Sequence, residues 1–160
     1  MLNLASTSDL ISIYTFSAAD IAVHATWVDL LTTTGAVTPG RTNTPTITAS
    51  TTTTVVASPA ANTVRNVKML SVRNVDTADS CLIQVQHYDG TTTHPLWKGQ
   101  LSIGETVVFT EGTGWIRLNS AGTPTGSNLS AQSDVQTFTA GGTWTKPTAF
   151  TPKVVIVEMI

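Results

Sequence analysis

Hydrophobic and polar residues alternate along much of residues 10–118, and this two-residue period is typical of β-strands with one buried face. The clearest case is Asp20–Leu30, where Ile21, Val23 and Ala25 fall on one face and His24 falls on the other. The β-branched residues in this segment favour a strand over a helix, because they lose side-chain freedom in a helix. The pattern therefore predicts a strand with one face in a hydrophobic core.

The same pattern predicts further short strands, which turn residues separate. These strands are Leu10–Phe16, Arg65–Val75, Cys81–Tyr88, Leu96–Ile103, Val107–Thr110 and Trp115–Leu118. Asp89 and Gly90 form the strongest short-range hairpin signal in the chain. With about seven or eight strands and hardly any helix signal, the sequence predicts an all-β fold, a β-sandwich of jelly-roll-like type.

Two stretches between these strands are harder to interpret. Residues 31–46 contain Gly35, Pro39, Gly40 and Pro45, and these residues predict a loop. The threonine-rich segment Ile47–Val56 has few large side chains for packing. It predicts one or two exposed or edge strands, and a flexible arm is the alternative.

The composition changes at residue 120, where a stretch rich in Gly, Pro and Ser begins. We therefore expect a sandwich domain over residues 1–119, a linker over 120–134 and the start of a second β module over 135–160. The last segment contains the apolar run Val154, Val155, Ile156 and Val157, which predicts a strand. Such a strand needs a partner, either from a longer continuation of the chain or from another chain.

The overall composition favours a protein that packs against neighbours. Hydrophobic residues make up 41% of the chain, enough for a core, but charged residues make up only 11%, against roughly 25% in typical globular domains. The net charge of −2 and the scattered Lys and Arg residues give no basic surface for nucleic acid. No apolar run approaches the roughly 20 residues of a membrane helix, and no signal peptide is recognisable at the N-terminus. We expect synthesis in a cytoplasm and no membrane insertion.

Candidate catalytic and metal-binding residues are sparse. His24, His87 and His94 lie on separate segments and lack the spacing of a zinc hydrolase motif. The Asp residues flank turns, where Asp is a common turn residue, and no carboxylate pair of glycosidase type stands out. Cys81 is the only cysteine and is expected to be a small buried residue. The sequence thus predicts no enzyme activity, no metal and no cofactor, and it disfavours a polysaccharide hydrolase.

Aromatic residues leave one binding alternative open. The four tryptophans, Trp27, Trp97, Trp115 and Trp144, lie among apolar neighbours, which favours core packing. Aromatic faces on strands can also stack on sugar rings. If any aromatic side chains are exposed, Tyr88 and Trp97 beside the Asp89–Gly90 turn are the expected contacts for a glycan or a partner.

Several segments resemble proteins of bacteriophage tails. These segments are Ile21–Asp29, Thr38–Thr44, Arg65–Lys68, Arg73–Asn74, Gln86–Thr91, Gly104–Thr106 and Glu111–Trp115. Together they resemble a domain of tail-associated structural proteins over about residues 8 to 120. Phe138–Pro147 is similar to the opening of glycine-rich C-terminal domains of phage fibre and tail proteins. In that family a long glycine-rich stretch follows the strand that corresponds to Val154–Glu158, so a continuation of this kind is expected beyond residue 160.

The resemblance implies a structural component of a virion: a tail fibre, spike or baseplate-associated protein. Such a protein would dock onto tail, baseplate or collar proteins by its sandwich and project a distal module. The resemblance also implies a homo-oligomer, with a trimer favoured. The alternative function is a receptor-binding module that recognises a bacterial surface glycan.

Overall fold

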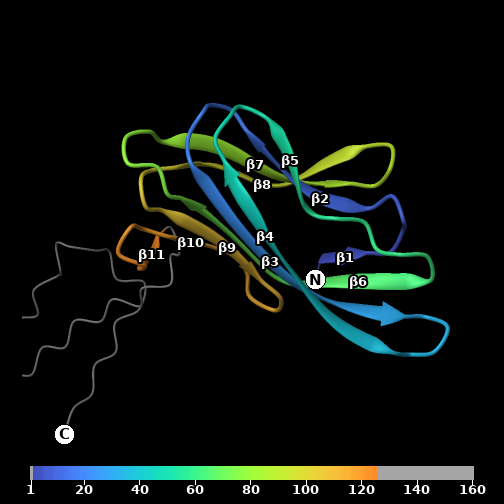
Figure 1. Ribbon diagram of the computed structural model, residues 1–160. Helices are drawn as coiled ribbons and strands as arrows, with labels where there is room; N and C mark the ends of the chain where they lie inside the picture. Colours follow the sequence, from blue (N-terminus) through green and yellow to red (C-terminus); the bar gives the residue numbers. More distant parts are fainter. Residues whose placement is uncertain (1, 126–160) are drawn as a thin grey trace, which may run out of the picture. The chain divides into compact units, whose positions relative to one another are not determined.

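The computed structural model of the chain describes residues 2–125, which form two antiparallel β-sheets (Figure 1). The strands are β1 (Leu2–Leu4), β2 (Leu10–Thr15), β3 (Ile21–Leu31), β4 (Val37–Ile47), β5 (Thr52–Val56), β6 (Thr63–Asn74), β7 (Cys81–Tyr88), β8 (Thr93–Leu101), β9 (Thr106–Thr110), β10 (Gly114–Leu118) and β11 (Pro124–Thr125). The predicted all-β, sandwich-like fold is confirmed. Among these residues no helix is long and apolar enough to cross a membrane.

One sheet has seven strands and the other has four. The order in the seven-stranded sheet is β11-β10-β9-β6-β3-β4, and β1 also pairs with β6. β1 and β9 pair with successive parts of β6, and β3 pairs with β6 along its whole length. The order in the four-stranded sheet is β5-β2-β7-β8. The hairpin of β3 and β4 extends with β6 to one end of the molecule (Figure 1).

The core lies between the two sheets and follows the alternation of the sequence. β2 buries Ile11 and Ile13, and β7 buries Ile83 and Val85 completely. The seven-stranded sheet contributes a matching set from its central strands: Ile21, Val23, Ala25, Val67, Leu70, Val72, Val107 and Phe109. Burial of each large aliphatic side chain stabilises the fold by roughly 1.5–3 kcal/mol. The predicted buried face of Asp20–Leu30 and the predicted strand Cys81–Tyr88 are therefore confirmed.

The prediction of a loop over residues 31–46 is wrong, because β4 occupies most of that stretch. The N–H of Leu31 donates to the C=O of Ala36 at 2.9 Å. Leu31 and Ala36 thus form a hydrogen-bonded pair, and such pairs alternate with non-bonded pairs along an antiparallel ladder. By this alternation Val28 and Pro39 are a non-bonded pair. The backbone nitrogen of Pro39 therefore points away from β3, and its missing N–H breaks no bond there. Pro45 lies where the register with β3 shifts. β4 is an edge strand, and sheets tolerate prolines on edge strands and at bulges.

The threonine-rich segment forms β5, which is an edge strand of the four-stranded sheet, as predicted. Two short strands, β1 and β11, were not predicted. Since β11 pairs with β10, the sheet continues into residues 120–134, which the composition had assigned to a linker. The rest of that linker, Trp144 and the strand of Val154, Val155, Ile156 and Val157 lie outside the described residues.

Candidate functional site

Tyr88 and Trp97 do not form a common binding surface. In the register of β7 and β8, Tyr88 lies opposite Thr93, whereas Trp97 lies opposite the buried Val85. Side chains alternate between faces along a strand, so Tyr88 falls on the outer face of the four-stranded sheet. Trp97 faces the core and packs against Trp115 of the other sheet, with ring centroids 6.2 Å apart.

Trp97 belongs to an aromatic cluster that joins the two sheets. Phe109 of β9 and Trp115 of β10 have ring centroids 5.3 Å apart, and both lie on the core side. A Cβ atom at Gly99 would lie 2.7 Å from the Trp97 ring, so the indole occupies the space that a side chain at this position would need. Trp27 also packs against the core. The three described tryptophans are thus half-buried packing residues, as the favoured interpretation predicted.

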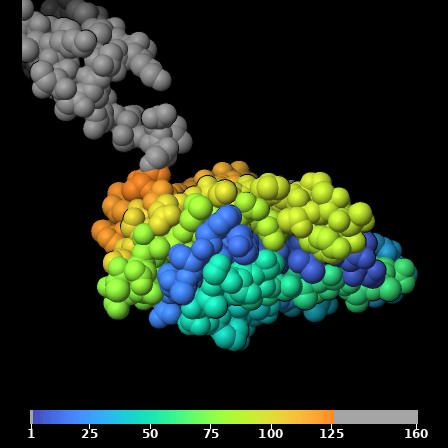
Figure 2. All heavy atoms as spheres, turned by 90° about the horizontal axis from the view of Figure 1, so that it is seen from above, coloured from blue at the N-terminus to red at the C-terminus, as the bar shows by residue number. Residues whose placement is uncertain are grey.

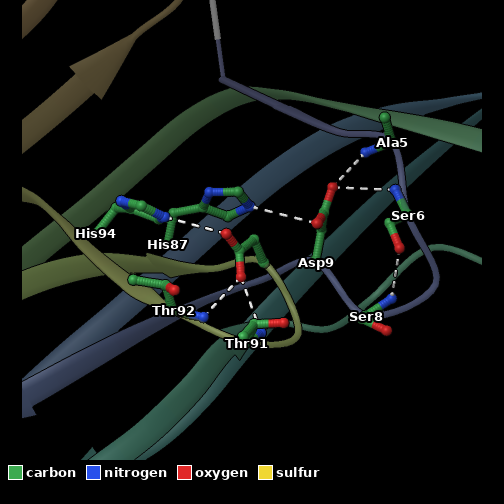
Figure 3. Close-up of polar contacts among 9 residues, drawn as sticks. Ala5, Ser6, Ser8, Asp9, His87, Thr91, Thr92 and His94 are labelled. Atoms are coloured by element: carbon green, nitrogen blue, oxygen red, sulfur yellow. Dashed lines mark hydrogen bonds and ion pairs between the residues drawn. The ribbon is translucent and has the colours of Figure 1, made fainter.

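His87 faces a carboxylate from a distant part of the sequence. Its Nε2 atom lies 3.8 Å from Oδ1 of Asp9, in the turn between β1 and β2 (Figure 3). The other carboxylate oxygen of Asp9 accepts the backbone N–H groups of Ala5 at 2.7 Å and Ser6 at 3.0 Å. Nε2 of His87 is buried and has no hydrogen-bond partner within residues 2–125. Asp9 therefore fixes the turn and places one free oxygen toward the imidazole.

A second histidine–carboxylate pair lies beside the first. His94 is the cross-strand partner of His87, and their ring centroids are 6.3 Å apart. Nε2 of His94 lies 3.1 Å from Oδ2 of Asp89, whose Oδ1 accepts the N–H groups of Thr91 and Thr92 (Figure 3). The Thr92 and Thr91 hydrogen bonds, and then that of His94, lower the pKa of Asp89 to about 2. Asp89 is therefore negatively charged at neutral pH, and its carboxylate shapes the β7–β8 turn.

The two pairs have the same composition, since an aspartate carboxylate faces the imidazole in each of them. Within residues 2–125 no group of three or more His, Cys, Asp or Glu side chains could hold a metal ion. No sequence motif predicts the Asp9–His87 contact, because it joins residues that only the fold brings together.

A shallow depression lies on the other sheet, where β3, β4 and β6 meet. Its lining residues are Thr26, Trp27, Val28, Pro39, Gly40, Arg41 and Lys68. A Cβ atom at Gly40 would lie 2.3 Å from Nε1 of Trp27, so only glycine fits beneath this indole. Lys68 forms an ion pair with Glu111 in the turn between β9 and β10, whereas Arg41 is exposed. The depression is mainly apolar with cations beside it.

The hairpin next to this depression is held by Arg65. Its guanidinium donates to both carboxylate oxygens of Asp29 at 2.8 Å and to the C=O of Ala57 at 2.8 Å, and it stacks over Trp27 at 4.4 Å. Bidentate pairs of this kind fix geometry as well as adding energy. Arg65 thus positions the extended end of β3 against the loop after β5.

An apolar row lies on the outer face of the same hairpin. Leu30 is the cross-strand partner of both Val37 and Val64, and it falls on the face opposite Trp27 and Asp29. Leu30 is 42% exposed and Val37 is 63% exposed. Adjacent large apolar side chains with this exposure are the kind of surface that marks a protein contact.

No family model, curated protein or solved structure matches this chain. The resemblance to phage tail proteins therefore stays a prediction from the sequence.

Proposed function

We propose that this chain is a structural component of a bacteriophage virion, part of a tail fibre, spike or baseplate, whose β-sandwich binds another virion protein. The resemblance over about residues 8 to 120 supports the phage assignment. The apolar row of Leu30, Val37 and Val64, in which Leu30 and Val37 are exposed and Val64 is half-buried, supports binding to another protein. This row is the observation that carries the proposal.

The surroundings of the row suit a protein contact. Arg65 fixes the hairpin through Asp29 and Trp27, so the exposed side chains are presented on a rigid support. Preorganised surfaces bind more tightly because less conformational entropy is lost on association. The depression beside the row, with Arg41 at its border, offers a recess for an apolar side chain of the partner.

Labelling of particles tests the virion assignment directly. Antibodies against the purified chain should bind intact particles released by the genome that encodes it, seen by gold labelling in the electron microscope. In the same particles, Val37→Asp should reduce incorporation of the chain, because a charge replaces the most exposed side chain of the row. Thr33→Asp, at the exposed tip of the hairpin, is the matched control. Unlabelled particles that contain no trace of the chain by mass spectrometry would refute the virion role.

A second candidate function, glycan recognition, is favoured by the outer face of the four-stranded sheet. Tyr14 and Phe16 of this face form an edge-to-face pair with ring centroids 4.5 Å apart, and Phe16 is 39% exposed. Beside them Gln84 donates to Gln86, which donates to Ser12. Aromatic rings beside amides are a common way to bind sugars.

Glycan binding would use Tyr14 and Gln84, neither of which was singled out by the sequence. Binding of the purified chain to an array of bacterial surface glycans tests it. Tyr14→Ala should abolish any signal, and Thr93→Ala on β8 serves as the control. Equal binding by both variants would assign the signal to another surface.

A further inference from the structure

The edge strands of the two sheets differ in how well they are protected against pairing with another chain. β4 and β11 end the path of the seven-stranded sheet, and β5 and β8 are the outer strands of the four-stranded sheet. Proline occurs in three of these strands: Pro39 and Pro45 in β4, Pro95 in β8 and Pro124 in β11. Proline at an edge blocks strand addition, because it cannot donate a ladder hydrogen bond. β5, with the sequence TTTVV, contains none. β1, which pairs with β6, also lacks proline, but with three residues it is the kind of very short edge strand that resists strand addition.

The free side of β5 presents its own backbone groups. The N–H of Thr15 donates to the C=O of Thr51 at 3.0 Å, which makes Thr15 and Thr51 a hydrogen-bonded pair. The next pairs along β5 are alternately non-bonded and hydrogen-bonded. Thr52 and Thr54 belong to the non-bonded pairs, so their N–H and C=O groups point away from β2. Both of these residues are exposed. The segment that contains β5, teal in Figure 2, reaches the molecular surface.

The edge strand β5 and its neighbour β2 carry no charged side chain. Neither the outer strand Thr52–Val56 nor its neighbour Leu10–Thr15 contains Asp, Glu, Lys, Arg or His. In a twofold contact the same residues meet from both copies, so a charged strip would repel its symmetry mate. Here threonine would face threonine across the axis, and such cross-strand pairs are favourable. The edge is complementary to itself.

We propose that β5 pairs antiparallel with β5 of a second copy and joins the two four-stranded sheets into one continuous sheet across a twofold axis. A pair of short strands contributes few hydrogen bonds, each worth about 0.5–1.5 kcal/mol net. Association of two free chains is therefore weak, and it strengthens where several copies are held together. This pairing does not depend on a virion role, and it differs from the trimer that the resemblance implies.

Sedimentation equilibrium of the full chain tests this pairing. The wild-type mass should rise with concentration from that of one chain toward that of two. Thr54→Pro removes an outward N–H, and Thr54→Lys places like charges across the axis, so each should weaken dimerisation by about tenfold or more. Thr93→Lys, on the exposed edge strand β8, is the control and should dimerise like the wild type. Circular dichroism establishes that each variant is folded.

Three outcomes would overturn the pairing. They are a chain that stays monomeric up to about millimolar concentration, a trimer, and a dimer that folded Thr54→Lys leaves unchanged. If Thr54→Pro unfolds the chain, the Thr54→Lys variant decides the question, because it changes only a side chain and keeps every backbone N–H of β5. Particle labelling answers the question of virion function separately, since a monomer could still be found in particles.

Discussion

β4 and β5 follow each other in the chain, and both are threonine-rich edge strands, yet their free sides are built differently. β4 has Pro39 and Pro45, and Arg41 lies between them. β5 has no proline and no charge. Both strands are rich in threonine, but only β4 contains proline, glycine and a charged residue, so threonine content alone does not tell an edge that resists pairing from one that accepts it. The position of each proline relative to the hydrogen-bonded pairs decides this.

The largest expected effect distinguishes the two ends of β4. Ile47, at the end near β5, is buried, whereas Val37, at the hairpin end, is 63% exposed. Ile47→Ala should lower the free energy of unfolding by about 2–5 kcal/mol because it leaves a cavity in the core. Val37→Ala should change it by no more than about 0.5 kcal/mol. Urea denaturation measures both, and similar losses would show that the hairpin end is packed in solution.

Gly40→Ala tests the close contact between β4 and the Trp27 indole. The added methyl would lie 2.3 Å from Nε1 of Trp27, so the indole must move away from its contact with Arg65. Overpacking of this kind costs about 1–3 kcal/mol of unfolding free energy. Thermal unfolding followed by tryptophan fluorescence measures the loss. Thr38→Ala, two residues earlier on the same strand, should be close to neutral, and an equally stable Gly40→Ala variant would rule out the close Trp27–Gly40 contact.

The stability that the β7–β8 turn contributes to the fold should depend on pH in the acid range, whereas β5 has no charged group that could titrate there. The pKa of Asp89 is lowered from 3.8 to about 2 by hydrogen bonds from Thr92, Thr91 and His94. A carboxylate with a lowered pKa stabilises the fold above its unfolded pKa, and this contribution is lost as the pH falls from about 4 to about 2. Asp89→Asn should therefore reduce the loss of stability over that range. Denaturation curves at several pH values measure this, and parallel profiles for the two proteins would contradict it.

Association through β5 should be nearly independent of salt. Screening weakens contacts between exposed charges, but β5 and its neighbour β2 carry none. The dimerisation constant should therefore change by less than about twofold between low and physiological ionic strength. Sedimentation at several salt concentrations measures it. A steep salt dependence would point instead to a charged surface, such as the one around Arg41 and Lys68.

Much of the fold was predictable because the strands obey simple alternation. Cys81–Tyr88 and the buried faces of β2 and β3 follow directly from the spacing of their apolar residues. β4 was missed because proline and glycine normally end a strand, and the sequence does not reveal which side of a strand each proline faces. β1 and β11 are too short to show a period.

The candidate sites were less predictable than the fold. Tyr88 and Trp97 are close in sequence, but the register of β7 and β8 places them on opposite faces. Asp9 and His87 are far apart in sequence, and only the pairing of β2 with β7 brings them together. The open edge of β5 depends on its neighbours in the sheet, which no local pattern contains.

Amide hydrogen exchange tests the contrast between the two edges most directly. The outward N–H groups of Thr52 and Thr54 on β5 and of Arg41 and Asn43 on β4 are compared in one sample at low and at high protein concentration. We predict that exchange at Thr52 and Thr54 slows as the concentration rises, while exchange at Arg41 and Asn43 stays the same. Equal rates at Thr52 and Thr54 at all concentrations, or slowing at Arg41 and Asn43 instead, would contradict the assignment of β5 as the open edge.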